Sequence, residues 1–317
     1  MRRFLGFGIL ILIMFALDAC EDLAFRDHLD RIVKEQIARV AYYAGEDTDS
    51  TEIYIMDSDG RFSKRLTENS VKDRFPDWSP DGTRIAFSSG RASGVDEEIY
   101  VMDADGTGIV RVTTGGSGDV HFQPEWSPDG TRLVYTRYWP SWHQDIFVIA
   151  LSDTGFGINL TNSSGGTSEY EGFPDWSPDG DHIVFMTKIY NDVWQIARLE
   201  VASPGNMTRI TSNGYADQDP AWSPDGTLIA FFSNRGPSDT NEICVIDATA
   251  EDGVPAETRL TDNSAEDKWP EWSPDGSKII FVSDRDGYNE VYTMNPDGTD
   301  QRRLTNTVAK DYCPDWR

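Results

Sequence analysis

The sequence predicts an all-β protein: a six-bladed β-propeller of four-stranded antiparallel blades, with one blade shared between the N- and C-termini. Three observations support this fold. A seven-residue motif recurs along the chain, four strand-like segments accompany each copy, and an incomplete first repeat is matched by a leftover piece of motif at the end. The 317 residues are ample for one large all-β domain.

The motif first occurs at Pro76–Gly82 and reads Pro-Asp-Trp-Ser-Pro-Asp-Gly. Related copies occupy Pro124–Gly130, Pro174–Gly180, Pro220–Gly226 and Pro270–Gly276, and a shortened copy begins at Pro314. The offsets between successive leading prolines are 48, 50, 46, 50 and 44 residues. Strand-rich repeats with a period of about 40–50 residues are typical of propeller blades.

Each repeat is expected to contain four short strands. Ser-Pro-Asp-Gly favours a tight turn, because Pro presets φ and Gly accepts the left-handed position, so the turn joins a first strand to a second. In the first full repeat, the later strands are expected at Ile85–Phe87, Glu98–Met102 and Arg111–Thr113. In the repeat that begins at Pro174, the third strand is expected at Asp192–Trp194.

One Trp recurs at the same place in every repeat, which favours packing over ligand binding. These residues are Trp78, Trp126, Trp176, Trp222, Trp272 and Trp316. The last one belongs to the shortened copy. Residues 38–67 match the later part of a repeat but lack its first strand, which the C-terminal residues can supply. Such sharing closes a ring and removes an open sheet edge.

The N-terminus has the form of an export signal. Arg2 and Arg3 precede an apolar run, and Leu17-Asp18-Ala19-Cys20 is similar to a bacterial lipobox. We therefore expect a signal peptide over residues 1–19, lipid attachment at Cys20 with a short helical tether over 20–37, and the propeller over 38–317. An ordinary secretory signal and an uncleaved anchor are the alternatives.

The formal net charge of −26 argues against nucleic acid as a partner, since phosphate binding needs clustered Lys and Arg. It favours cationic partners, although an acidic surface also simply keeps an exported protein soluble. We expect a monomer that meets the membrane only through its N-terminal lipid. Cys244 and Cys313 are interpreted as two separate thiols rather than a disulfide.

No recognisable catalytic motif is present, neither Gly-x-Ser-x-Gly nor His-Glu-x-x-His nor a glycine-rich phosphate loop. His121 and His143 fall on one face of one repeat, but two His without a third ligand are a weak metal signal. The runs Asp57–Gly60 and Asp103–Gly106 look like fragments of calcium loops, although Asp-x-Asp-Gly between strands is usually a turn. We expect no cofactor, with calcium as the one candidate.

The repeats resemble the propeller of the TolB family. The resemblance rests on the recurring Pro-x-Trp-Ser-Pro-Asp-Gly, on Ser283–Gly287 followed by Glu290–Tyr292, and on the closing Arg-Leu-Thr of each repeat. It covers residues 38–317 and implies six blades in an exported envelope protein. Only about 17 residues separate Cys20 from the first expected strand, so the resemblance does not extend to the α/β domain that precedes the propeller in TolB. Propeller domains of prolyl-oligopeptidase-type hydrolases have similar repeats.

Two groups of residues are candidate partner-binding sites on the face that carries the variable loops. The first is a set of carboxylates three residues before the repeat Pro, at a position that His121 occupies in the second copy: Asp73, Glu171, Asp217, Asp267 and Asp311. Converging carboxylates would form a negative funnel for a basic peptide or a divalent cation. The alternative is that each one caps a turn or accepts backbone N–H bonds.

The second group is aromatic and comprises Tyr138, Trp139 and Trp142. These residues have no counterpart in other repeats, and exposed aromatic side chains often anchor partners. The alternative is that their loop folds onto its own blade. The hypothesis is therefore a non-catalytic envelope propeller that binds a protein or peptide. The alternatives are a polysaccharide-active lyase or hydrolase and a carbohydrate-binding module.

Overall fold

In the computed structural model, the regular elements of the described part of the chain are all β-strands, which agrees with the predicted all-β class. The structure describes residues 39–45, 50–92, 96–139, 143–153, 155–161, 170–188, 193–235, 239–250, 257–307 and 309–317. Within these ranges no helix has the length and apolar character needed to cross a bilayer. The expected signal peptide, Cys20 and the tether lie outside the described residues.

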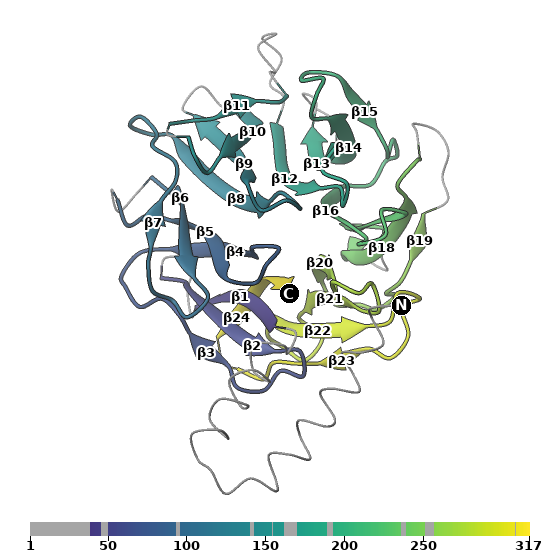
Figure 1. Cartoon of the computed structure of the whole chain (residues 1–317). Helices are drawn as coiled ribbons and strands as arrows, with labels where there is room; N and C mark the ends of the chain where they lie inside the picture. Colours follow the sequence, from purple (N-terminus) through teal and green to yellow (C-terminus); the bar gives the residue numbers. More distant parts are fainter. Residues whose placement is uncertain are drawn as a thin grey trace, which may run out of the picture. The chain divides into compact units, whose positions relative to one another are not determined.

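Residues Val40–Arg317 form one unit of antiparallel sheets (Figure 1). One sheet has the order β24 (Lys310–Trp316), β1 (Arg39–Gly45), β2 (Glu52–Asp57), β3 (Lys64–Arg65). The next has the order β4 (Asp73–Trp78), β5 (Arg84–Ser89), β6 (Glu98–Asp103), β7 (Val110–Arg111). Two more have the orders β16 (Asp217–Trp222), β17 (Leu228–Ser233), β18 (Glu242–Asp247), β19 (Thr258–Arg259) and β20 (Asp267–Trp272), β21 (Ile279–Ser283), β22 (Glu290–Met294), β23 (Arg302–Arg303).

The remaining eight strands form two groups of four that meet at one point. The first group is β8 (Val120–Trp126), β9 (Arg132–Trp139), β10 (His143–Ala150) and β11 (Ile158–Asn159). The second is β12 (Tyr170–Trp176), β13 (His182–Lys188), β14 (Gln195–Glu200) and β15 (Met207–Arg209). A single parallel pair, Gln144 with Tyr170, joins β10 to β12.

The first three strands of each repeat lie where they are expected, except in the repeat that begins at Pro174. The fourth strands end earlier than expected, as β7 shows at Val110–Arg111 in place of Arg111–Thr113. In the repeat that begins at Pro174, the third strand is Gln195–Glu200, not Asp192–Trp194. Val193 and Trp194 precede that strand. Gln195 occupies the place that an acidic residue fills at Glu98 and Glu242, so the acidic Asp192 gave a misleading alignment.

The two ends of the chain pair with each other. β1 and β24 are antiparallel partners, with Val40 opposite Trp316 and Ala44 opposite Asp311. The first strands of successive sheets also contact one another in sequence, β4 with β8, β8 with β12, and so on to β20, and β24 contacts both β20 and β4. In Figure 1, strands β4, β8, β12, β16 and β20 lie nearest the centre of this arrangement.

Every one of these first strands carries an irregularity at the residue before its repeat Pro. That residue has a positive φ in all six strands: Phe75, Gln123, Phe173, Asp219, Trp269 and Cys313, at φ values of 52, 56, 50, 55, 55 and 39 degrees. The pairing register shifts at the same point in each strand, as in a β-bulge. A left-handed non-glycine residue is uncommon, so its presence at six equivalent positions shows that this conformation is a regular structural feature of the repeat.

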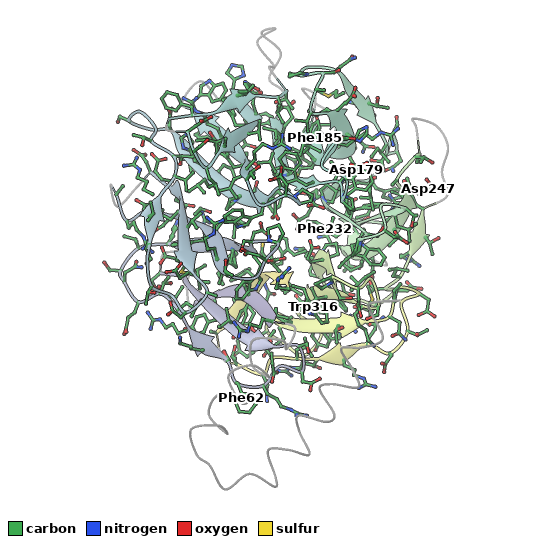
Figure 2. All side chains as sticks on the ribbon, in the orientation of Figure 1. Phe62, Asp179, Phe185, Phe232, Asp247 and Trp316 are labelled. Atoms are coloured by element: carbon green, nitrogen blue, oxygen red, sulfur yellow. The ribbon has the colours of Figure 1, made fainter. Side chains whose placement is uncertain are left out.

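The core lies between neighbouring sheets. Five of the six repeat Trp side chains are buried, at 4–9% exposure, and each contributes to an apolar cluster with strands of the preceding sheet. The prediction that they serve packing is confirmed for these five. Trp316 is half-buried and packs against the cluster that includes Val40 and Ile280 (Figure 2).

Candidate functional site

A cavity of about 60 Å³ lies where the six first strands converge. We call it the axial cavity. Its walls are the repeat prolines and the residues on either side of them. Those before the prolines are Phe75, Gln123, Phe173, Asp219, Trp269 and Cys313, and those after them are Glu125, Asp175, Ala221, Glu271 and Asp315.

The residues before the prolines bring aromatic rings together across the cavity. The rings of Phe75 and Phe173 meet edge to face with their centroids 6.0 Å apart, although they come from β4 and β12. Tyr43 packs on the other side of Phe75 at 5.3 Å. The left-handed backbone directs these side chains inward, and edge-to-face contacts stabilise such pairs.

The carboxylates after the prolines link neighbouring sheets. Asp315 accepts the backbone N–H of Trp78 at 2.6 Å, Asp77 accepts that of Trp126 at 2.5 Å, and Asp175 accepts that of Trp222 at 2.6 Å. Each bond runs from the Trp of one repeat to the acid of the preceding first strand. These three bonds tie the first strand of one sheet to the first strand of the next.

Burial and mutual repulsion shift the proton affinity of these acids. Burial raises the pKa of Asp175 to about 7 and that of Asp315 to about 6. Burial, together with neighbouring carboxylates, raises the pKa of Asp77, Glu125 and Glu271 well above the ordinary value. Like charges buried close together cannot all ionise, so the cavity retains protons near neutral pH.

The carboxylates that were expected to form a funnel are buried and lie away from the axial cavity. Asp73, Asp217 and Asp267 are fully buried, and none of them lines the axial cavity. Each accepts hydrogen bonds from an Arg guanidinium and from an Asn amide. The pairs are Asp73 with Arg91 and Asn69, Asp217 with Arg235 and Asn213, and Asp267 with Arg285 and Asn263. We call each trio a clasp.

The other members of the predicted funnel are also buried. Glu171 and Asp311 are inaccessible to solvent, and burial raises the pKa of Asp311 to about 7. His121 is equally buried, with its Nδ1 2.8 Å from a carboxylate oxygen of Glu98. The expectation of an open ring of like charge at these positions is therefore wrong. Binding of a partner by these residues stays a prediction.

The aromatic candidates divide into described and undescribed residues. Tyr138 and Trp139 are the last residues of β9 and are half-buried. The Trp139 indole packs edge to face on Phe147, 5.9 Å between centroids, so the expected exposed patch does not hold for it. Trp142 lies outside the described residues. Partner binding by these three residues also stays a prediction.

Sequence patterns that suggested metals have structural roles where the structure describes them. Gly60 donates its N–H to the Asp57 carbonyl and Gly106 donates to that of Asp103, so both Asp-x-Asp-Gly runs are turns. Among the described residues, no three His, Cys, Asp or Glu side chains are arranged to hold a metal ion. Cys244 and Cys313 are free thiols, as predicted.

Two signals in the sequence could have located these acids correctly. In three repeats an Asn precedes the acid by four residues and an Arg follows it by eighteen, as at Asn69, Asp73 and Arg91. That spacing predicts a local ion pair rather than a free charge. The second signal is the acid that directly follows the repeat Pro in five of the six copies.

Antiparallel groups of four strands recur along the chain, and each includes one Pro-x-Trp strand near the centre. This arrangement defines a repeat protein of the β-propeller type. A family model described as TolB beta propeller domain matches residues 38–164 and 117–240. These matches cover more than half of the chain, which therefore belongs to the TolB beta propeller domain family.

Known proteins share this fold at low identity. The crystal structure of TolB from Acinetobacter baumannii aligns with a TM-score of 0.73 at 21% identity, covering 91% of this chain and 70% of that one. An oligogalacturonate lyase in complex with manganese aligns with a TM-score of 0.56 at 18% identity, covering 84% of this chain and 73% of that one. An uncharacterized protein of Agrobacterium fabrum is 35% identical over 77 residues, which span 24% of this chain and 26% of that relative.

Proposed function

We propose that this chain is a non-catalytic six-bladed propeller of the cell envelope that binds a protein or peptide with basic segments. It is exported, lipidated at Cys20, and engages its partner on the face that carries the loops between second and third strands. The pairing of β24 with β1 supports a sixth blade built from both ends of the chain.

The small size of the axial cavity is the observation that carries this proposal. Pockets for small-molecule substrates usually have volumes of about 300–1,000 Å³. The axial cavity offers about 60 Å³, which suits a few water molecules or the tip of one side chain. Aromatic rings and carboxylates line it, and both favour a cationic side chain.

The overall charge supports the same class of partner. A net charge of −26 draws basic segments toward the molecule and accelerates their association at low ionic strength. The loops between second and third strands vary in length and sequence from repeat to repeat. Variable loops on a repeated scaffold are the usual place for specific recognition.

The test measures binding of a Lys-rich peptide to the protein by fluorescence anisotropy at low and high salt. At pH 8 the double variant Asp175→Asn with Asp315→Asn removes the charge of two axial carboxylates, whose folded pKa values are about 7 and 6, while keeping hydrogen-bond acceptors. Asp59→Asn removes an equal kind of charge from an exposed side chain, 69% accessible, and is the control. We expect salt-sensitive binding that the double variant weakens at least tenfold and the control retains. Equal binding by all three proteins would refute the proposal.

A polysaccharide-active enzyme or a carbohydrate-binding module is the second candidate. The likeness to oligogalacturonate lyase motivates it. His121 argues against a His-dependent metal site on the loop face, because it is fully buried and bonded to Glu98. A glycan array with acidic and neutral oligosaccharides, followed by an assay for new unsaturated ends, separates this candidate from the first. Glycan binding without peptide binding would favour the carbohydrate-binding module, and cleavage would favour the enzyme.

A further inference from the structure

A second cavity, of about 560 Å³, opens between two neighbouring sheets beside the Ser-Pro-Asp-Gly turns. We call it the turn-face cavity. Its walls include Asp179 and His182 at the start of β13, Arg198 on β14, and Trp222 with Asp225 from the following repeat. It lies at the opposite ends of the strands from the variable loops, and none of its lining residues belongs to the axial cavity.

Two equivalent places in the fold show what normally occupies this position. The first residue of the second strand reaches across to the Trp of the next repeat. The Arg84 guanidinium carbon lies 4.5 Å from the ring centroid of Trp126, and that of Arg132 lies 4.6 Å from Trp176. These two interfaces are filled by a guanidinium stacked on an indole, whereas Leu228 packs in the cluster of Trp272 at the corresponding place.

His182 occupies the same register in the next repeat. The backbone N–H of His182 donates to Ser177 Oγ at 2.9 Å, just as the backbone N–H of Arg84 donates to Ser79 Oγ. An imidazole is shorter than an arginine side chain, so the space above Trp222 is left open. Trp222 is 9% exposed, compared with 6% for Trp126 and 4% for Trp176.

The repeat of His182 has the same turn Asp as the repeats in which an Arg stacks on the Trp. Asp81 lies in the turn before Arg84, and Asp179 lies in the corresponding turn before His182. Asp179 is exposed and is labelled in Figure 2. Asp225 lines the cavity from the turn of the following repeat. A carboxylate and an indole face, without the guanidinium that stacks on the indole in the equivalent positions, form a complementary receptor for a cation.

Arg198 is the one cation among the described lining residues of the cavity. It stands where other repeats have Val101 or Val245. Its guanidinium donates a hydrogen bond to the carbonyl of Ala248 in the following repeat. Arg198 also lowers the pKa of Asp247, after that carboxylate's bonds to Thr249. The Arg198 charge thus also acts on Asp247, and the carboxylates of Asp179 and Asp225 leave the cavity net negative.

We propose that the turn-face cavity binds an arginine side chain of a protein or peptide partner. The guanidinium stacks on Trp222, as Arg84 and Arg132 stack on Trp126 and Trp176 within the protein, and lies beside the Asp179 carboxylate. The cavity volume falls within the range of ligand pockets and leaves room for the stem of the side chain and adjoining backbone. This site is distinct from the loop face, so its failure would leave the proposed function untouched.

The test uses N-acetyl-arginine amide as the probe and N-acetyl-citrulline amide as its neutral isostere. Backbone amide shifts of Trp222 and Thr249 are followed by NMR during titration. We expect saturable binding of the arginine probe at about millimolar concentration, a scale that corresponds to about −4 kcal/mol. The citrulline probe should bind at least tenfold more weakly. Equal binding of both probes would overturn the proposal.

Two variants test whether the space above Trp222 in the turn-face cavity is the arginine site. His182→Arg restores the residue found in the filled positions, so it should fold normally and abolish binding of the probe. Arg84→His empties an equivalent position and should create a second site, which appears as new shifts near Trp126. Unchanged probe binding in His182→Arg overturns the proposal, whatever Arg84→His does. Asp179→Asn gives an independent measure, since binding should weaken while the turn keeps its hydrogen-bond acceptor.

Discussion

Folding stability is expected to fall as pH rises from 5.5 to 8, because the axial cavity retains protons in the folded state. Asp175 has an ordinary pKa of 3.8 and a folded pKa of about 7, raised by burial. A carboxyl with a raised folded pKa binds its proton more tightly in the folded than in the unfolded state. No free energy is therefore lost to it below pH 4, and the full loss is reached above pH 7.

The magnitude follows from the width of that window. Each pH unit between the two pKa values corresponds to about 1.4 kcal/mol for one group. Between pH 5.5 and 7, Asp175 alone would lower the free energy of unfolding by about 2 kcal/mol. Asp175 is half-buried and coupled to Asp315, so we expect about 1–2 kcal/mol, or about 2–6 °C in Tm.

The variant Asp175→Asn removes the titrating group and keeps an oxygen to accept the Trp222 N–H. It should be more stable than the wild type at pH 8, by a smaller margin at pH 5.5, and equal to it only below about pH 4, as measured by denaturant unfolding at these three values. Asp59→Asn, at an exposed position, is the matched control. A wild-type stability that rises toward pH 8, or a variant that is weaker at pH 8, would refute the reasoning.

Four further outcomes are expected. The pKa of Glu98 is lowered to about 2, because hydrogen bonds from His121 and Thr113 outweigh burial, so its contribution to stability should be lost as pH falls from about 4.5 toward 2 in acid titrations followed by circular dichroism. A fatty-acid analogue should label the wild-type protein in cells and not Cys20→Ser; equal labelling would contradict lipidation. Trp316→Ala should lower the free energy of unfolding by about 2–4 kcal/mol, below the full cost for a buried Trp because it is half-exposed, and an unchanged Tm would argue against ring closure by β24. Asp267→Ala should cost about 3–5 kcal/mol, because Arg285 loses its buried partner, whereas Asp267→Asn should cost less.

The fold could be predicted from the sequence because one turn motif recurs with little change. Ser-Pro-Asp-Gly fixes the first hairpin of each repeat, and each Trp beside it is a landmark for the register. The one misplaced third strand, at Gln195–Glu200, lacks the acidic residue that marks the third strand elsewhere. Pattern reasoning failed there because a neutral amide performs the same hydrogen-bonding task in that repeat.

The candidate site was predicted less well, because strand alternation breaks at the residue before the Pro. Alternation places residues i and i+2 on one face of a strand. The left-handed residue at Phe75 shifts the register between Arg74 and Asp77, so counting back from the Pro does not identify the residues that face the axis. The acids three residues before the Pro consequently point into their own blade, and those one residue after it lie beside the axial cavity.

The same geometry explains why Trp139 has no counterpart in other repeats. It stands eighteen residues after His121, the spacing that separates Asp73 from Arg91 in a clasp. Arg91 lies 5.0 Å over the ring of Tyr100, and Trp139 packs on Phe147, which occupies the equivalent place on the third strand. In this repeat the Arg–acid pair is displaced by two residues, because Arg137 lies 5.3 Å over the Phe147 ring and donates to Asp119, eighteen residues before it. Trp139 therefore packs beside that pair, with the Arg137 guanidinium 5.0 Å from its ring, where His121 leaves no carboxylate to pair with.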